Sequence, residues 1–220
     1  MLKALIFDFD GLILDTEMPD YQSWQTVYAL FEQSLPIELW GQIVGGTGAS
    51  DFDPHTYLEQ LTDQTLDREE IWLDRRKQYL DQVANQPILP GVTEMMNAAE
   101  KMKVKLGLAS SSPANWVHGH LQRLELFHRF HVIKTADDVV KTKPDPELFN
   151  SVLNAFDISG NEAIVFEDSP NGVLAAHAAG IPSVAIPNEL TAQLEFEHAS
   201  LRLNSMADYS LVEMLEKLDI

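Results

Sequence analysis

The hydrophobic positions of this chain follow two different rhythms. Short, nearly continuous apolar runs are typical of strands buried on both faces. They cover residues 4–9, 104–109, 131–134, 163–167 and 182–187. Apolar residues at helical spacing lie between or beside these runs, at 92–103, 113–126, 146–156 and 171–180. The alternation predicts an α/β fold, with a Rossmann-like parallel sheet covered by helices on both faces.

Residues 17–85 interrupt this alternation, because they contain helical patterns with no strand between them. Apolar residues recur at helical spacing from Tyr21 to Phe31 and again from Ile71 to Val83. Prolines and a glycine flank the segment, which suits two tethers. The predicted division is a core domain of residues 1–16 and 86–220 with an inserted all-helical domain of residues 17–85. Two chain crossings in parallel are what a hinged lid needs.

Composition narrows the possible functions. With 220 residues, 45% of them apolar, the chain can bury a substantial core. The sequence contains no cysteine, which excludes disulfides, zinc–thiolate sites and a cysteine nucleophile. We see no signal-peptide pattern and no apolar run of membrane-spanning length, and therefore expect a cytoplasmic protein.

The formal net charge of −19 opposes binding to nucleic acid and to anionic membranes, and we expect neither as a partner. The same negative field opposes a phosphorylated ligand. A site for a small phosphate would therefore need local positive charge, supplied by a metal ion or by a few lysines.

Polar side chains gather where the predicted strands end. They are Asp8 and Asp10 after the first strand, Ser110 to Ser112 after the second, Lys143 after the third, and Glu167 and Asp168 at the fourth. Ligands of open parallel sheets bind at the carboxyl ends of the strands. Carboxylates, a hydroxyl and a lysine at one edge predict a site for magnesium and a phosphate group.

The spacing of the first pair has a chemical explanation. Residues two apart in an extended chain point to the same side, so Asp8 and Asp10 can face one small substrate. One carboxylate can attack phosphorus as a nucleophile, while the second protonates the departing oxygen and then activates water. Gly11 would allow the sharp turn and close approach that such a site needs.

Four segments together resemble a known family. They are DFDGLILDTE at 8–17, LASSS at 108–112, KPDPELF at 143–149 and VFEDSPNGVLAAHAAG at 165–180. In this order they are similar to the four motifs of the haloacid dehalogenase-like hydrolase superfamily. The helical insert resembles the C1 cap of the subgroup that contains phosphoglycolate phosphatase and β-phosphoglucomutase.

The resemblance implies roles for the acidic residues. Asp8 would be the nucleophile that becomes an aspartyl-phosphate, and Asp10 the general acid and base. Magnesium would be held by Asp8, by the backbone carbonyl of Asp10 and by Asp168, with Glu167 acting directly or through a water molecule. The dehalogenase branch of the family lacks the second aspartate, so Asp10 argues against that activity.

The resemblance also implies how a phosphoryl group is held. Ser110 would hydrogen-bond the group, with Ser111 beside it, and Lys143 would neutralise its charge and fix Asp8. Each feature has a plainer alternative: Asp168 could cap the next helix, Lys143 could be solvated, and the serines could form a polar turn. The implied function is a magnesium-dependent phosphatase that hydrolyses a small phosphorylated metabolite such as a sugar phosphate, and we expect a monomer.

Two other functions are alternatives to hydrolysis. In the phosphosugar mutases that the chain resembles, the resemblance implies that a histidine on the first cap helix helps gate catalysis and that an arginine in the following cap loop holds the second phosphate. Here Asp20 takes the helix position and residues 47–50 contain no arginine. Both differences favour hydrolysis, because an acidic residue would repel a second phosphate. A phospho-aspartate signalling module is the remote alternative, but such modules are shorter and lack both the insert and the second aspartate.

Substrate specificity is expected from the insert and the core surface facing it. The candidates are Asp20, Tyr21, Trp24, Thr47, Arg75, Asn115 and His118. We expect Trp24, Trp40 and Trp72 to form the core of the insert rather than to stack on a ligand. The glycine-rich segment 41–48 lacks the lysine and the preceding strand of a phosphate-binding P-loop, and is expected to be a flexible loop.

Overall fold

The structure is a computed structural model, and it describes residues 1–40 and 52–220. Across these two ranges, the helices are all too short or too polar to traverse a lipid bilayer.

A parallel six-stranded sheet forms the centre of the molecule, with the strand order β3-β2-β1-β4-β5-β6. The strands are β1 (Ala4–Phe7), β2 (Lys105–Ala109), β3 (Val132–Lys134), β4 (Ala163–Glu167), β5 (Ser183–Ala185) and β6 (Leu201–Arg202). The α/β prediction is confirmed, and five strands lie within the predicted runs. The edge strand β6 was missed, because two residues are too short for any hydrophobic pattern.

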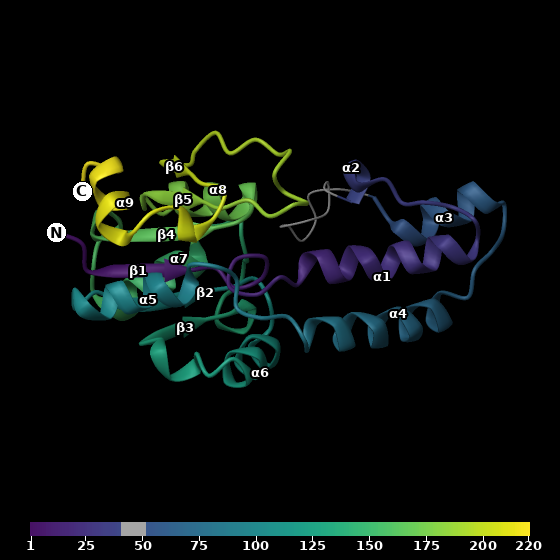
Figure 1. The fold of residues 1–220 in the computed structure, drawn as a ribbon, viewed down its shortest axis with the longest axis horizontal. Helices are drawn as coiled ribbons and strands as arrows, with labels where there is room; N and C mark the ends of the chain where they lie inside the picture. The colour runs from purple at the N-terminus through teal and green to yellow at the C-terminus, as the bar shows by residue number, and fades with distance from the viewer. Residues whose placement is uncertain (41–51) are drawn as a thin grey trace.

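Helices cover both faces of the sheet (Figure 1). They are α5 (Val92–Lys101), α6 (Ala114–Arg123), α7 (Glu147–Phe156), α8 (Pro170–Ala178) and α9 (Leu211–Lys217). Short 3₁₀ helices span Phe127–Arg129, Ala136–Asp138, Gly160–Glu162 and Met206–Asp208.

Strand β1 illustrates why the sheet needs two layers of helices. Leu5 and Phe7 belong to the hydrophobic cluster that includes residues of α5, α6 and α9. Ala4 and Ile6 belong to the opposite cluster, with residues of α7 and α8. Alternate side chains of a strand point to opposite faces, so an apolar run without alternation is buried from both sides.

Between β1 and α5 the described residues form four helices, and we call residues 17–85 the helical insert. They are α1 (Glu17–Leu30), α2 (Ile37–Trp40), α3 (Pro54–Thr62) and α4 (Arg68–Val83). Figure 1 shows α1 and α4 side by side, extending beyond the carboxyl ends of the strands. The insert has its own apolar cluster, in which Trp24, Tyr28 and Leu58 are buried. The carboxyl ends of the strands therefore face the insert.

One expectation about the insert was wrong. Trp24 and Trp40 are each only 4% exposed, but Trp72 is 50% exposed on α4. The neighbouring Ile71 packs against the insert cluster, and the next residue of a helix is turned away by about 100°. Trp72 therefore points out of the cluster. The glycine-rich segment 41–48 lies outside the described residues.

The two tethers of the insert touch each other. The backbone N–H of Leu89 donates to the carbonyl of Ile13 at 2.9 Å, and Leu14 pairs with Ile88 in an isolated antiparallel bridge. The chain therefore leaves the core and returns to it at one place, where Ile13 and Leu14 meet Ile88 and Leu89.

Candidate active site

Asp8 follows β1 directly and is held at the carboxyl edge of the sheet. Its backbone N–H donates to the Phe166 carbonyl at 3.0 Å, which extends the pairing of β1 with β4 by one residue. The Asp8 side chain is buried, with only 7% of the residue exposed. Burial raises the pKa of Asp8 to about 8, although the nearby Lys143 ammonium opposes this rise.

Lys143 supplies the positive charge beside Asp8. Its ammonium group donates to an Asp8 carboxylate oxygen, to the Ala109 carbonyl at 2.7 Å and to Glu167 Oε1 at 2.6 Å. Although burial opposes the charge, attraction to Asp8 and Glu167 raises the pKa of Lys143 above its usual value. Lys143 is therefore a buried, charged group and not a solvated surface lysine.

Glu167 is fully buried, and both of its carboxylate oxygens accept hydrogen bonds. Oε1 accepts from Lys143, while Oε2 accepts from the Asp168 N–H at 3.1 Å, from the Ser169 N–H at 3.2 Å and from Ser169 Oγ at 3.0 Å. Ser169, not Asp168, is the N-cap residue of α8 and accepts from the Gly172 N–H. Asp168 is thus free of the capping role that its sequence position allowed.

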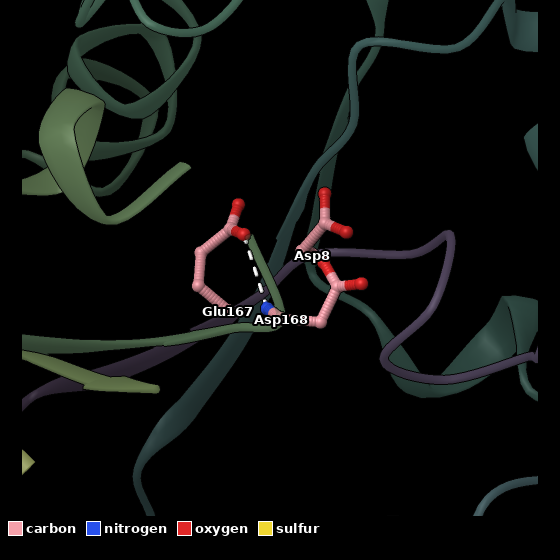
Figure 2. A group of neighbouring side chains, drawn as sticks. All are labelled: Asp8, Glu167 and Asp168. Atoms are coloured by element: carbon pink, nitrogen blue, oxygen red, sulfur yellow. Dashed lines mark hydrogen bonds between the residues drawn. The ribbon is translucent and has the colours of Figure 1, made fainter. Parts of the chain in front are cut away.

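Asp8, Glu167 and Asp168 form a group of buried carboxylates where β1 and β4 end (Figure 2). Each offers an oxygen atom, and these atoms lie within 4.8 Å of one another. Burial and repulsion from Asp8 raise the pKa of Asp168 well above its usual value. Three carboxylates against one lysine leave an excess of negative charge. Hard oxygen donors in this number fit a cation such as Mg²⁺.

Asn188 orients one of these carboxylates. Its Nδ2 donates to Asp168 Oδ2 at 2.8 Å, and its Oδ1 accepts from the backbone N–H groups of Leu190 and Thr191. The asparagine therefore fixes Asp168 against the loop that follows β5. Partners of this kind determine which oxygen a ligating carboxylate presents.

Gly11 is required by the close approach of backbone to this group. Its φ of +76° lies in the left-handed region, and a Cβ there would lie 2.0 Å from Asp168 Oδ2. A side chain at this position would strain the turn and collide with the carboxylate. The turn brings Asp10 back toward the site after Asp8.

Four donors surround the Asp10 carboxylate. Oδ1 accepts from Thr16 Oγ1 at 2.9 Å and from Trp116 Nε1 at 2.8 Å. Oδ2 accepts from Ser112 Oγ at 2.7 Å and from Ser110 Oγ at 3.4 Å. Donors on both oxygens fix the plane of the carboxylate.

These groups meet in a cavity of about 640 Å³ between the sheet edge and the insert. Asp8, Asp10, Ser110, Ser111, Lys143, Glu167 and Asp168 all line it, together with Asp20 and Asn115. The structure therefore brings together the residues that four separate sequence segments supply, and adds two of the expected specificity residues.

Several expected specificity residues lie away from the cavity wall. Trp24 is buried inside the insert, and Arg75 packs over its ring and pairs with Asp20. Tyr21 donates to the Leu35 carbonyl at 2.8 Å, and His118 packs edge-on against Phe127. Thr47 lies outside the described residues. Because Arg75 neutralises Asp20, the negative charge expected to repel a second phosphate is offset.

Other residues of the wall were not predicted. They are Thr16, Glu17, Trp40, Arg76, Tyr79, Pro113, Trp116 and Ser169. Ser112, which the sequence had placed with Ser110 and Ser111 after the second strand, also lines the cavity, and Trp116 follows that segment on α6. Arg76 and Tyr79 are three residues apart on α4 and therefore lie on the same helix face. This spacing is the sequence signal that could have identified them together.

Glu17 adds a further carboxyl group to the wall at the start of α1. Burial, with repulsion from Asp10 and Asp20, raises its pKa to about 8. The cavity wall thus combines carboxyl groups with one guanidinium group, aromatic rings and hydroxyl groups.

Comparison with known proteins establishes the family. The haloacid dehalogenase-like hydrolase family matches residues 5–186, and the chain belongs to it. The chain is 43% identical to YhcW of Bacillus subtilis (strain 168), with 100% of this chain and 99% of that protein covered, and the name of YhcW provisionally describes a phosphatase.

Two further relatives extend the comparison. The phosphorylated carbohydrates phosphatase of Thermotoga maritima is 28% identical over 83% of this chain and 84% of its own. The crystal structure of CbbY from Rhodobacter sphaeroides in complex with phosphate shares the fold, with a TM-score of 0.75, 22% identity and complete coverage of both chains.

Proposed function

We propose that the protein is a magnesium-dependent phosphatase that hydrolyses a small phosphorylated metabolite through an aspartyl-phosphate intermediate. The observation that carries this proposal is the placement of Asp8 and Asp10 in one cavity, with the Lys143 ammonium bound to Asp8. A nucleophile, an acid–base group and a fixed positive charge at one sheet edge are what phosphoryl transfer to a carboxylate needs.

In the proposed reaction the ionised Asp8 carboxylate attacks phosphorus, and the bond from phosphorus to the alcohol oxygen breaks. Asp10 gives a proton to that oxygen, and afterwards removes a proton from the water that hydrolyses the aspartyl-phosphate. Ser110, Ser111 and Lys143 would hold the phosphoryl oxygens. Lys143 is kept in place by Glu167, whose oxygens are already occupied by donors.

Asp8, Asp168 and the backbone carbonyl of Asp10 would hold Mg²⁺, with Glu167 behind them. The crowded carboxylates favour a cation, because burial and then repulsion from neighbouring carboxylates raise the pKa values of Asp8 and Asp168. When bound, Mg²⁺ would offset the charge of the phosphate and of the carboxylates that surround it.

The insert, residues 17–85, is proposed to act as a cap on the core of residues 1–16 and 86–220. It supplies Asp20, Trp40, Arg76 and Tyr79 to the cavity wall. Hydroxyl groups of a sugar phosphate would find donors and acceptors there, and the name of the Thermotoga maritima relative supports a carbohydrate phosphate as the substrate class. A cap over the cavity would also exclude water from the reacting group.

The test is a screen of purified protein against phosphorylated metabolites, with and without Mg²⁺, that measures inorganic phosphate. We expect phosphate release from at least one sugar phosphate, and its loss when the metal is chelated. Chromatography of the products separates the alternatives: an isomeric sugar phosphate without phosphate release would identify a mutase. Stable labelling of Asp8 without turnover would instead identify a signalling module.

A further inference from the structure

Trp116 occupies the junction between the core and the insert. It lies on α6, and its indole ring stacks on the Tyr79 ring of α4, with centroids 5.7 Å apart and an interplanar angle of 13°. The same indole donates from Nε1 to Asp10 Oδ1 at 2.8 Å. One side chain therefore touches both the insert and the acid–base group of the core.

The indole plane is fixed from several directions. The Arg76 guanidinium lies 5.7 Å from the Trp116 ring centroid and 5.4 Å from that of Tyr79. The His120 ring packs edge-on against Trp116, with centroids 4.2 Å apart. A planar side chain held in this way can point its N–H in only one direction, and here that direction is Asp10.

We propose that Trp116 is a positioning residue that orients the Asp10 carboxylate, and that the stacked Tyr79 ring couples this orientation to the position of the insert. This inference rests on the proposed function, because it needs Asp10 to act as the acid and base. Thr16, the other donor to Oδ1, immediately precedes α1 of the insert. Both donors to this oxygen are thus connected to the insert, one through the chain and one through a ring contact.

The coupling has a simple physical basis. A carboxylate that rotates freely presents the wrong oxygen for much of the time, and proton transfer is sensitive to displacements of about 1 Å. If the insert moves away from the core, the Tyr79 ring leaves the indole, and Trp116 loses a partner that restricts its rotation. The core serines would still donate to Oδ2, but Oδ1 would be oriented less precisely when the insert moves away from the cavity.

The test uses two substrates that differ in their need for an acid. An alkyl phosphate needs a proton on its departing oxygen, whereas p-nitrophenyl phosphate releases an anion that is stable near neutral pH. The value of kcat/KM covers the steps up to release of the alcohol. For Trp116→Phe, which keeps an aromatic ring but loses the N–H, we expect the ratio of alkyl to aryl kcat/KM to fall about tenfold.

Variants of Tyr79 test the coupling. Tyr79→Leu should lower the same ratio, and Tyr79→Phe, which keeps the ring, should lower it less. Because both changes act on one hydrogen bond, the combination of Trp116→Phe and Tyr79→Leu should lower the ratio by less than the product of the two separate effects. Trp72→Phe is the matched control, since Trp72 lies on α4 like Tyr79 but is exposed and outside the cavity.

A ratio within twofold of the wild type in Trp116→Phe would overturn the inference, as would equal losses on both substrates. If the double variant lowers the ratio by the full product of the two separate effects, the coupling between Trp116 and Tyr79 is overturned. Failure of the proposed function is a different result, in which the wild-type protein itself hydrolyses neither substrate.

Discussion

At the scale of single residues, the site consists of charged groups that hold one another. Lys143 bridges Asp8 and Glu167, and Glu167 in turn accepts from the backbone of Asp168 and from Ser169. Such a network costs desolvation energy, but each buried group has a partner that offsets part of it. The Asp8 carboxylate is therefore held in one orientation before any substrate binds.

We expect Asp8→Asn to lower phosphatase kcat by about a thousandfold or more, because an amide is a poor nucleophile. Activity of Asp8→Asn within tenfold of the wild type would contradict the assignment of the nucleophile.

Asp10→Asn should also remove turnover. It should leave Mg²⁺ affinity, measured by isothermal titration calorimetry, nearly unchanged, since the proposed metal contact there is a backbone carbonyl.

Asn188→Ala should weaken Mg²⁺ binding about tenfold, because Asp168 loses the amide donor that orients it. Calorimetry measures this without any substrate. Asn85→Ala is a suitable control, since that side chain is exposed and donates to the Asp81 carbonyl. Equal Mg²⁺ affinity in the wild type and Asn188→Ala would exclude a role for Asn188 in the metal site.

At the scale of elements, the start of α8 shows how closely a helix approaches the site. Ser169 caps the helix, and Gly172 in its first turn faces the Glu167 carboxylate. A Cβ on Gly172 would lie 1.8 Å from Glu167 Cδ, inside any allowed contact. The helix can therefore cover the carboxylate only because residue 172 has no side chain.

Gly172→Ala should lower the free energy of unfolding by about 2 kcal/mol, because α8 or Glu167 must move. It should also lower kcat, since Glu167 holds Lys143. Gly119→Ala is the matched control: a Cβ there meets nothing within 4 Å, and alanine favours a helix. We expect that control to raise the free energy of unfolding by about 0.5–1 kcal/mol. Urea denaturation of both variants measures the contrast, and similar values would refute the close approach.

At the scale of the whole molecule, the cavity concentrates carboxyl groups in a chain that already carries a net charge of −19. Only the joining of insert and core brings Glu17 and Asp20 near Asp8 and Asp10. Their repulsion must be met by protonation, by Lys143 and Arg76, or by a bound cation. That the protein is a monomer stays a prediction.

The pKa of Glu17 makes stability depend on pH. Its ordinary value of 4.5 in the unfolded chain rises to about 8 in the folded protein. Between these values the folded state keeps a proton that the unfolded state releases, so stability falls as pH rises from 4.5 through 8.

Glu17→Gln removes this titration. We compare the free energy of unfolding of the variant with that of the wild type at each pH. The difference in favour of the variant should be larger at pH 8 than at pH 5 by about 1–3 kcal/mol. Urea denaturation with a metal chelator present measures the difference, and the acidic groups distant from Glu17 cancel because both proteins contain them. The same gain at both pH values would contradict the raised pKa of Glu17.

The sequence by itself determined the parallel α/β architecture and the residues that gather at the sheet edge. Its apolar runs are long enough to identify five strands, and a parallel sheet places all their carboxyl ends at one edge. The two-residue spacing of Asp8 and Asp10 follows from the geometry of an extended chain. These are local properties, so a linear pattern contains them.

Only the tertiary structure decided which face of α4 reaches the cavity and what lies against it. A helical pattern identifies an apolar face, but residues at its border, such as Arg75 and Arg76, can point to either side. The docking of the insert turned Arg75 toward Asp20 and Arg76 toward the cavity, and stacked Tyr79 on Trp116. Contacts between residues this distant in sequence depend on how two packed units meet, and no local pattern records that.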